Sequence, residues 1–497
     1  MLDLEHITKQ LSSKLESYKR EYNPFVTGEV LECNDDVIFA SGLSSVCYGE
    51  LLKIKSCYAM VLNLESEKVG AVVLNNAEEI CAGDTVFATG HVLDVGVSDD
   101  ILGRVVNPLG TPIDNLGEIV ADKYQKLEAD APQIVHRAAV NEPLETGIIS
   151  IDSMIPIGKG QRELIIGDRQ TGKTAIAIDA ILNQKGKDVI CVYVAIGQKA
   201  SSTTKILQTF RNFGALSYTT IVSASADQAA SMQYLAPYTG CAIAEYFMHR
   251  GKDVLIVYDD LTKHAVAYRT LTLLLKRPSG REAYPGDIFY THSRLLERAA
   301  KLNDAHGGGS MTALPIIETQ MGDISAYIPT NVISITDGQI FLETELFRAG
   351  IRPAINVGLS VSRVGGAAQH SAMKKISGKL RLELANYREL VVFSQFTSDL
   401  DFETKKTLDH GLMLTQGLTQ KQYQPQNYEK QIVFLHLLIN NIFDDISPYK
   451  INATLQNFYE YLKDTHSSAI DNIMENKVLN LNTINIIKNA AEKFKAL

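Results

Sequence analysis

The chain has 497 residues, of which 45% are hydrophobic and 21% are charged, so its composition is that of a folded globular protein. A single hydrophobic core stops growing well below this length, and roughly two to four domains are therefore expected. The formal charge of −9 at pH 7 argues against a broad surface for nucleic acid. The six cysteines are scattered, without a Cys-x-x-Cys pair or a metal-ligand spacing, which favours a reducing compartment.

Residues 1–22 are predicted to form an amphipathic helix, because leucine and isoleucine recur at helical spacing among charged and polar residues. Such a helix is either a frayed terminus or a docking helix for another subunit, and the residues leave both interpretations open. In residues 23–92 short β-branched runs alternate with glycines. Short strands at turn spacing predict a small β-barrel or sandwich in this segment.

Residues 93–371 alternate apolar strand candidates with amphipathic helices, which predicts an α/β domain with a mostly parallel sheet. In residues 372–497 leucine recurs at helical spacing among Lys, Glu and Asn, which predicts a helical domain. The strand candidates are continuous apolar runs, at residues 163–166, 189–194, 220–222, 254–258, 332–335 and 355–361.

No signal peptide or transmembrane segment is predicted. Residues 1–7 lack the basic and apolar parts of a secretory signal and are too acidic for an organellar transit peptide. The apolar stretch at residues 431–443 is shorter than the ~20 residues that span a bilayer. Any association with a membrane is therefore expected to come through partners.

Residues 167–174 have the spacing of a phosphate-binding loop, with a glycine, four residues and then Gly-Lys-Thr, between a strand candidate and a helix. Glycines let such a loop curl so that N–H groups and the helix N-terminus face phosphate oxygens. Lys173 is expected to reach the β- and γ-phosphates, and the Thr174 hydroxyl is expected to bind Mg²⁺. The residues assigned to the nucleotide are Gly167, Asp168, Arg169, Gln170, Thr171, Gly172, Lys173 and Thr174.

A phosphate loop also needs a carboxylate at the end of a neighbouring strand to hold Mg²⁺ through water. The apolar run at residues 254–258 is followed by Asp259 and Asp260. A strand often ends in an Asp that only caps the next element, but the phosphate loop favours the metal role here. Asp259, directly after the strand, is the candidate for metal and nucleotide, and Asp260 is expected to be structural.

Several longer blocks resemble the alpha subunits of F-type ATP synthases. The resemblance is clearest over about residues 95–400, moderate over the barrel segment and weak towards the carboxyl end. The blocks that carry it are residues 160–174, 267–269, 278–287, 314–320, 328–342 and 349–369.

The resemblance implies a three-plus-three ring in which alpha subunits alternate with beta subunits around a rotating gamma central stalk. It also implies a delta subunit or peripheral stalk at the N-terminus, and ion flow through a membrane sector that the chain meets only indirectly. In that family the alpha subunit binds Mg-ATP or Mg-ADP without turning it over, while the beta subunit holds the catalytic site. The implied location is peripheral, on the cytoplasmic face of a bacterial plasma membrane, with an organelle-encoded chain as the alternative. No nucleic acid is expected.

Gln198 follows the strand after the phosphate loop and is assigned to the nucleotide site. By the resemblance, a catalytic beta subunit carries a glutamate there that polarises the attacking water. An amide cannot accept a proton at neutral pH, although a Gln orients water in other phosphate-loop enzymes. Gln198 therefore agrees with a site that does not turn over, without proving it.

Arg363 lies in the glycine-containing segment 360–366 and, by the resemblance, is an arginine finger that enters the neighbouring beta subunit's catalytic site. Its delocalised cation would stabilise charge on the transferring γ-phosphoryl group. Ser360 and Ser362 are expected to hold the turn or to make a hydrogen bond on the phosphate side. Without the surrounding block, such an arginine is ordinarily a solvated or salt-bridged loop residue.

The resemblance also implies that Arg352 and Pro353 pack near the adenine base, and that Gln420 and Gln422 approach it from the helical domain. Surface glutamines are usually just solvated, which is the alternative for the last pair. Two other functions stay open at this point. One is an autonomous motor ATPase, either a secretion ATPase or an RNA translocase, and the second is a structural ring subunit without nucleotide binding. Few basic residues at 26–92 argue against an RNA translocase, and the intact phosphate loop argues against the structural subunit.

Overall fold

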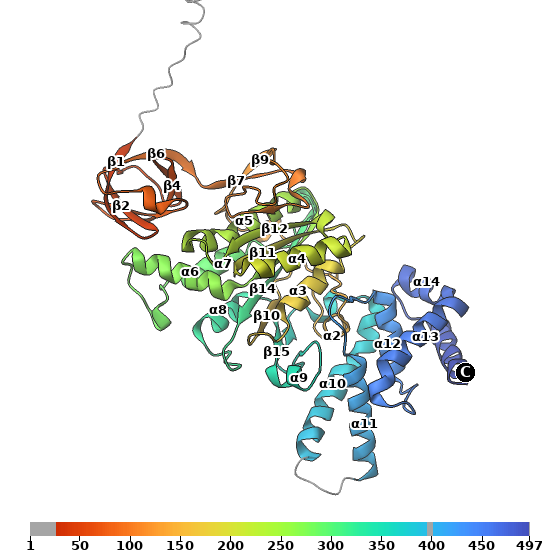
Figure 1. The fold of residues 1–497 in the computed structure, drawn as a ribbon. Coiled ribbons are helices and arrows are strands. Elements are labelled where there is room, and N and C mark those ends of the chain that lie inside the picture. Colours follow the sequence, from red (N-terminus) through yellow and green to blue (C-terminus); the bar gives the residue numbers. More distant parts are fainter. Residues whose placement is uncertain (1–25, 395–400, 497) are drawn as a thin grey trace, which may run out of the picture. The chain divides into compact units, whose positions relative to one another are not determined.

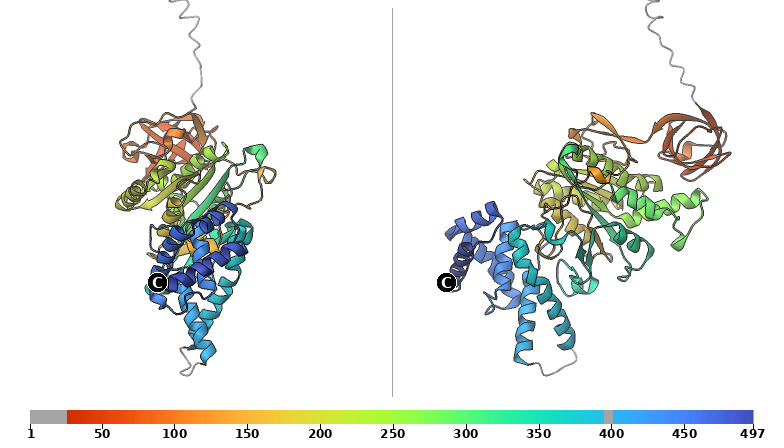
Figure 2. Two further views of the ribbon diagram at one scale, coloured as in Figure 1. Left: turned by 90° about the vertical axis from the view of Figure 1, so that its right-hand side faces the viewer. Right: turned by 180° about the vertical axis from the view of Figure 1, so that it is seen from behind.

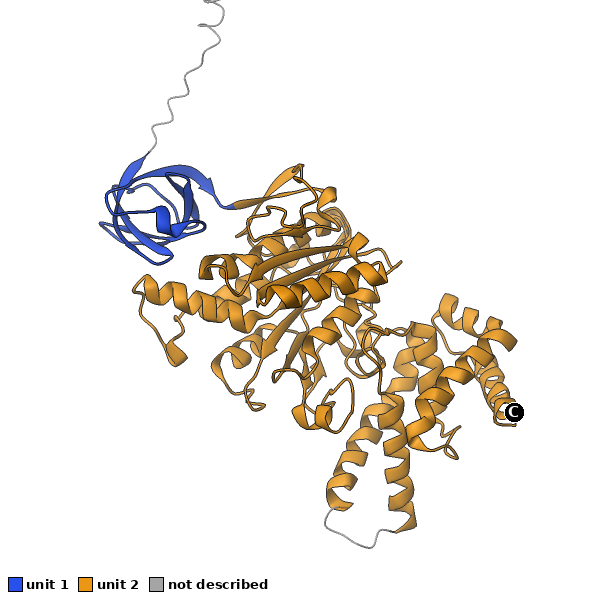
Figure 3. Cartoon of the chain, viewed as in Figure 1, with its two compact units in different colours: residues 1–93 blue, residues 94–497 orange. Residues whose placement is uncertain are grey.

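The computed structural model of the protein describes residues 26–394 and 401–496. The chain divides into two compact units, Met1–Leu93 and Asp94–Leu497 (Figure 3). The amphipathic helix predicted for residues 1–22 lies outside the described residues.

The strands of the first unit close into an antiparallel barrel, in the order β1-β2-β5-β4-β3-β6 (Figure 1). Apolar side chains from all of these strands fill its interior, including Ile38, Leu52 and Val61. Gly28 permits the close approach of β1 and β2, because a Cβ atom there would lie 2.1 Å from the Ser41 carbonyl oxygen. The strands are β1 (Thr27–Asn34), β2 (Val37–Ser41), β3 (Glu50–Ile54), β4 (Cys57–Leu64), β5 (Val69–Val73) and β6 (Thr85–Val92).

The second unit is built on a mixed sheet in the order β16-β15-β10-β14-β13-β11-β12-β8, in which only the edge strand β16 runs antiparallel to its neighbour. The central strands are buried at almost every position, because helices cover both faces and leave no solvent side. The strands are β8 (Val105–Val106), β10 (Leu164–Gly167), β11 (Val189–Gln198), β12 (Thr219–Ser225), β13 (Asp253–Asp259), β14 (Ser310–Glu318), β15 (Gly338–Leu342) and β16 (Val361–Ser362). A separate pair is formed by β7 (Asp94–Val97) and β9 (Lys123–Lys126).

Helices connect these strands, as the alternating sequence pattern predicted (Figure 1). Helix α5 packs along β11, β12 and β13, and α6 packs on β14. The helices are α2 (Ile149–Met154), α3 (Lys173–Leu182), α4 (Ala200–Phe213), α5 (Ala230–Met248), α6 (Leu261–Leu274), α7 (Ile288–Leu296), α8 (Tyr327–Ile335) and α9 (Thr344–Arg348).

Two of the predicted strands are wrong, and three strands of this sheet, β8, β14 and β15, were not predicted. Residues 332–335 end helix α8, where Ile328, Val332 and Ile335 are buried at helical spacing. Residues 357–359, in the middle of the predicted strand 355–361, form a turn, because the Asn356 side chain accepts the N–H groups of residues 358 and 359 and so ends the extended backbone. Of the missed strands, β14 lies at the centre of the sheet.

The last part of the chain is helical, as predicted. Figures 1 and 2 show α10 and α11 running side by side away from the sheet. The apolar stretch at residues 431–443 belongs largely to α12, which is buried among the other helices. The helices are α10 (Ser371–Ser394), α11 (Phe402–Gly417), α12 (Tyr428–Ile439), α13 (Ile451–Thr465), α14 (Ser467–Asn476) and α15 (Leu481–Lys495).

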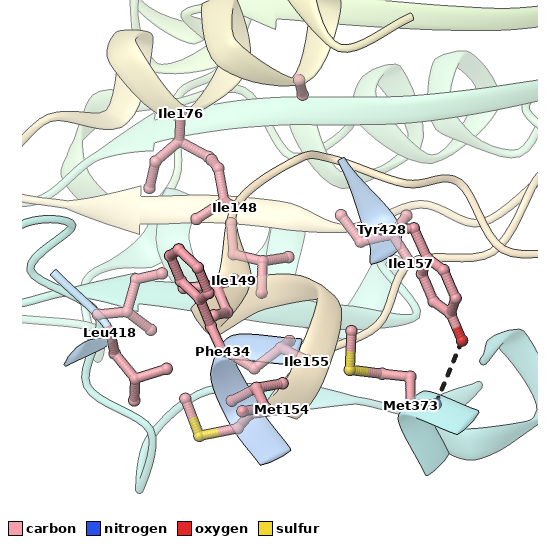
Figure 4. Close-up of a cluster of buried hydrophobic side chains, with 14 of the residues drawn as sticks. Ile148, Ile149, Met154, Ile155, Ile157, Ile176, Met373, Leu418, Tyr428 and Phe434 are labelled. Carbon is pink, nitrogen blue, oxygen red and sulfur yellow. Dashed lines mark hydrogen bonds between the residues drawn. The ribbon is translucent and has the colours of Figure 1, made fainter. Parts of the chain in front are cut away.

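One apolar core continues from the α/β part into the helical part (Figure 4). Ile149 of α2 and Ile176 of α3 belong to the same buried cluster as Met373 of α10 and Phe434 of α12. The Met373 N–H also donates a hydrogen bond to the Tyr428 hydroxyl at 3.2 Å. The helix that follows the phosphate loop is therefore packed into a core that the helical part shares.

Candidate nucleotide site

The predicted phosphate loop connects β10 to α3 at the carboxyl end of the parallel strands. Gly167 ends the strand, and a Cβ atom there would lie 2.6 Å from the Leu342 carbonyl oxygen, which only glycine avoids. Gln170 has a φ of 62° and Gly172 a φ of 101°, so the loop turns twice through left-handed backbone. The first N–H groups of α3 have no acceptor inside the helix, and this is the arrangement that binds phosphate at helix N-termini.

Lys173 is the first residue of α3 and is only 8% exposed. Its Nζ donates hydrogen bonds to the carbonyl oxygen of Gly167, at 2.8 Å, and to that of Asp168. Burial lowers the pKa of the ammonium group, and carboxylates nearby, with Glu318 first, act in the opposite direction. Two neutral carbonyl groups thus hold the Lys173 ammonium group inside the loop. A phosphate oxygen would be a stronger partner for this cation than either carbonyl group.

The two predicted metal residues, Thr174 and Asp259, are in direct contact. Thr174 Oγ1 donates to Asp259 Oδ2 at 2.7 Å, and the Tyr193 hydroxyl donates to the same oxygen at 2.6 Å. Gln198 Nε2 donates to Asp259 Oδ1 at 3.1 Å. Hydroxyl and carboxylate oxygens are the protein ligands that Mg²⁺ prefers, so the chemistry of this cluster fits the ion.

Asp260, the neighbour of Asp259, holds the start of helix α6. Its Oδ1 accepts the N–H of Lys263 at 2.8 Å. Burial raises the pKa of Asp260 to about 6, although the Lys263 ammonium group opposes the rise. Tyr193 was missed by the sequence reasoning, because a tyrosine within an apolar strand is usually core and its partner Asp259 lies on another strand.

Asp168 ties the phosphate loop to the segments that follow β14 and β15. Its Oδ1 accepts the Thr319 hydroxyl at 2.7 Å and the Gly322 N–H at 2.8 Å, and its Oδ2 accepts the Thr344 hydroxyl at 3.0 Å. Burial disfavours the charged carboxylate, but these donors outweigh it and lower the pKa of Asp168. The Thr171 hydroxyl closes the loop by donating to the Asp168 carbonyl at 2.8 Å. Asp168 and Thr171 therefore shape the loop from within.

Two of the predicted base contacts lie together. The Gln420 N–H donates to the Arg352 carbonyl oxygen at 2.7 Å. The Gln420 side-chain amide donates to the carbonyl oxygens of Gly147 and Gln424 at 2.9 and 2.7 Å, so its donors are used inside the chain. The Arg352 guanidinium lies over the Phe347 ring, 4.5 Å from its centre. A role of Arg352 and Gln420 at the base stays a prediction.

The remaining predicted contacts are spread around this region. Pro353 is partly buried behind a cis peptide bond, and Gln422 is exposed. The next residue, Tyr423, donates its N–H to Asp179 Oδ1 at 2.8 Å and so joins this segment to helix α3. Arg169 is exposed and pairs with the carboxylate that ends β14.

Arg363 lies at the opposite end of the sheet from the phosphate loop. Gly167 pairs with Leu342 at the end of β15, whereas Ser362 pairs with Gly338 at its start. The residue steps between these two positions correspond to about 13 Å at the usual rise of a strand. Arg363 is exposed, and its guanidinium makes no hydrogen bond or ion pair within residues 26–394 and 401–496.

The two serines beside Arg363 use their hydroxyl groups inside the chain. Ser360 is buried, donates to the Asn356 carbonyl at 2.7 Å and accepts the Phe341 N–H at 2.9 Å. Ser362 Oγ donates to the Pro156 carbonyl at 2.7 Å. In this structure both serines therefore hold the turn that presents Arg363.

Three models of one family match the chain. The ATP synthase alpha/beta family, beta-barrel domain, matches residues 26–90, and the nucleotide-binding domain of that family matches residues 147–362. The ATP synthase alpha/beta chain, C terminal domain, matches residues 369–494. Together they cover the barrel, the sheet with its phosphate loop and the helical part.

Curated relatives narrow the family to one type of subunit. The chain is 55% identical to ATP synthase subunit alpha of Clostridium kluyveri over 99% of this chain and 98% of that one. It is 56% identical to the same subunit of Clostridium acetobutylicum over the same shares, and 54% identical to that of Caldanaerobacter subterraneus over 99% and 97%. The chain belongs to the ATP synthase alpha subunit family.

An ATP synthase alpha subunit is part of a multisubunit enzyme, so the resemblance seen in the sequence is confirmed. The predicted fold class is confirmed too, with a barrel, a nucleotide-binding α/β domain and a helical domain. Within the described part of the alpha subunit, no helix combines the length and apolar character needed to cross a bilayer.

Proposed function

We propose that this alpha subunit holds Mg-ATP or Mg-ADP at residues 167–174 without turning it over, and supplies Arg363 to the catalytic site of an adjacent beta subunit. The position of Arg363 carries this proposal. An arginine finger has to touch the transferring γ-phosphoryl group. Because about 13 Å of strand separates the arginine turn from the chain's own loop, the exposed guanidinium can serve a nucleotide held by another chain.

Mg²⁺ would be bound by the Thr174 hydroxyl directly and by Asp259 through water, and it would neutralise charge on the phosphates. The hydrogen bond between these residues shows that both already face one point. Lys173 would exchange its two carbonyl partners for phosphate oxygens. Its burial favours this exchange, because a buried ammonium group gains more from an anionic partner than from a neutral one.

Gln198 supports a site without turnover. Its amide nitrogen faces Asp259 Oδ1, so the side chain is held against the metal carboxylate. The amide has no basic group that could take a proton from an attacking water at neutral pH. The nucleotide bound here would accordingly stay intact and stabilise the fold around the loop.

Arg363 would act on the neighbour through its planar, delocalised charge, which spreads over several phosphate oxygens at once. Ser360 and Ser362 would contribute by fixing the turn, since their hydroxyl groups are used by the chain itself. A polypeptide turn fixed in this way loses little freedom when the arginine enters the neighbouring site.

The partners belong to the same proposal. The alternating three-plus-three ring would contain beta subunits, with the gamma central stalk inside it and the delta subunit or peripheral stalk at the N-terminal segment. The membrane ion-translocating sector would be reached only through these subunits, on the cytoplasmic face of the plasma membrane. The bacterial relatives support this location.

The test of the trans role is Arg363→Ala in the assembled ring, with Arg211→Ala on α4 as a control, since Arg211 is also exposed. Arg363→Ala should leave assembly and nucleotide bound to this chain unchanged, while turnover falls about 10³- to 10⁵-fold, as for other arginine fingers. Arg211→Ala should turn over normally. Normal turnover with Arg363→Ala would refute the finger.

The test of the resident nucleotide is Lys173→Ala, with the exposed Lys205→Ala as its control. Rings with Lys173→Ala should assemble but lose the nucleotide of this chain on gel filtration, and wild-type rings should lose it when EDTA removes Mg²⁺. Unchanged retention in both cases would contradict the site. If the purified chain alone hydrolysed ATP at a rate on the order of tens per second, the site would be catalytic.

A further inference from the structure

The residues directly before β10 hold the turn that carries Arg363. Gln161 Nε2 donates hydrogen bonds to Glu163 Oε2 at 2.7 Å and to Ser362 Oγ at 3.2 Å. Gln161 Oε1 accepts the Gly158 N–H at 2.8 Å, so the amide is fixed at both ends. A chain of side-chain contacts therefore leads from Glu163 through Gln161 to the residue next to Arg363.

Arg162 holds the same turn from the other side of the strand, because neighbouring side chains alternate. Its guanidinium makes paired hydrogen bonds of 2.9 Å with the Asp337 carboxylate. The Asp337 carbonyl oxygen accepts the N–H of Arg363 at 2.8 Å. Arg162 thus supports the main chain of Arg363, while Gln161 and Glu163 support the preceding residue.

Glu163 is buried in an unusual way for a carboxyl group. It is 0% exposed, and its Oε1 has no hydrogen-bond partner within the described residues. The carboxyl group lies against Gly338, where a Cβ atom would be 2.5 Å from Oε2 and 2.2 Å from the Val361 carbonyl oxygen. The Glu163 carboxyl group thus fills the space that a side chain at position 338 would take, at the point where β16 pairs with β15.

We propose that Glu163 is a positioning residue for Arg363, acting through Gln161 and Ser362 to fix the turn from which the arginine reaches the neighbouring site. The role rests on the proposed function of Arg363. A core glutamate without such a role would be easily replaced by an apolar residue, because burying a half-satisfied carboxyl group costs stability. Glu163 contacts Gln161 and Gly338, and each of these is in turn bonded to or paired with Ser362, the residue before Arg363.

Burial favours the neutral form of the Glu163 carboxyl group. Burial raises the pKa of Glu163 well above its usual value; the Gln161 amide opposes the rise, Asp337 adds to it, and the Arg363 cation opposes it. A neutral acid and an amide have nearly the same shape, and each offers Gln161 an oxygen acceptor. Glutamine at this position should therefore preserve the support, whereas alanine removes it and leaves a cavity.

The test compares Glu163→Gln with Glu163→Ala in the assembled ring. Glu163→Ala should lower kcat on the order of 10- to 100-fold, because small displacements of a catalytic group are costly, while KM and the nucleotide bound by this chain change little. Glu163→Gln should keep turnover within about threefold of the wild-type ring. The control is Glu429→Ala on α12, which removes a buried glutamate far along the chain and should not change kcat.

The double variant Glu163→Ala with Arg363→Ala separates positioning from general stability. If Glu163 acts through the arginine, the double variant turns over no more slowly than Arg363→Ala alone. The role would be overturned if the turnover losses of Glu163→Ala and Arg363→Ala multiplied in the double variant. It would also be overturned if Glu163→Gln lowered turnover as much as Glu163→Ala does. Should Glu163→Ala rings fail to assemble, Gln161→Met breaks the same contact and should give the same kcat loss.

The two proposals fail in different ways. One outcome is that Arg363→Ala abolishes ring turnover while Glu163→Ala and Gln161→Met leave ring turnover unchanged. In that case the positioning role of Glu163 is wrong, and the arginine-finger role of Arg363 is retained. If Arg363→Ala itself leaves turnover normal, both are overturned.

Discussion

Replacing Asp179 by asparagine should stabilise the chain at about pH 8 and change its stability little at about pH 4. Asp179 lies on α3, is 6% exposed and accepts the Tyr423 N–H at 2.8 Å. Burial raises its pKa from 3.8 to about 7, and the single hydrogen bond does not offset the rise. The residue matters because this contact joins the helix of the phosphate loop to the segment that carries Gln420 and Gln422.

The sign follows from proton binding. Between these two pKa values the folded chain keeps a proton that the unfolded chain has lost, so stability falls as the pH rises and levels off above about pH 7. Each pH unit between the unfolded and folded pKa values of Asp179 lowers the free energy of unfolding by about 1.36 kcal/mol, and the whole interval lowers it by about 4 kcal/mol. Water that enters as the site relaxes reduces this cost, so a gain of about 2–4 kcal/mol is expected for Asp179→Asn at high pH.

The measurement is urea unfolding of the chain across this pH range, for the wild type and for Asp179→Asn, which keeps an oxygen acceptor for Tyr423. Asp114→Asn is the control of opposite sign, because the salt bridge with Arg104 holds the pKa of Asp114 below its usual value. That variant should be less stable than the wild type at neutral pH and should approach it in acid. An Asp179→Asn gain that is equal at pH values of about 4 and 8 would refute the reasoning.

Three further substitutions test single contacts within the second unit, each by the shift of the urea midpoint. Gly338→Ala should cost about 1–3 kcal/mol and impair ring turnover, because its Cβ would lie 2.2 Å from a backbone carbonyl oxygen that cannot move aside; a neutral result would mean that β16 can shift. Glu245→Ala should cost about 3–5 kcal/mol, since it leaves the Arg298 guanidinium buried without its carboxylate; a loss below about 1 kcal/mol would show that water reaches it. Tyr193→Phe should cost about 1.5–3 kcal/mol, because Asp259 loses a donor at 2.6 Å; an unchanged midpoint would contradict that hydrogen bond.

The fold was predictable from sequence where a local pattern had only one solution. The apolar runs that became β10, β11, β12 and β13 are continuous and alternate with helical stretches, so a buried parallel strand was the natural interpretation. The run at residues 332–335 is equally β-branched, but the burial of Ile328, Val332 and Ile335 continues a helical period that began upstream. Strand β14 was missed because Thr312 and Pro315 interrupt its apolar run, and a proline argues against a central strand.

The site was predictable to the extent that its residues lie in one segment. The phosphate loop is such a segment, and Asp259 could be found from the apolar strand before it. The contacts of Asp168 with Thr319 and Thr344 could not, because they join the ends of three strands that are adjacent only in the folded sheet. The same holds for Glu163, which precedes β10 in the sequence but supports a turn two hundred residues later.

Strands β10 and β15 connect the two functions proposed for this chain. At their carboxyl ends Gly167 lies close to Leu342, and the phosphate loop is tied to Thr344. At their amino ends Glu163 lies against Gly338, where β16 ends and the arginine turn begins. Close-packed strands transmit a displacement rather than absorb it. If the proposed nucleotide orders the loop, it would also steady the strands on which the proposed arginine finger depends, and a site without turnover would then serve the chemistry of its neighbour.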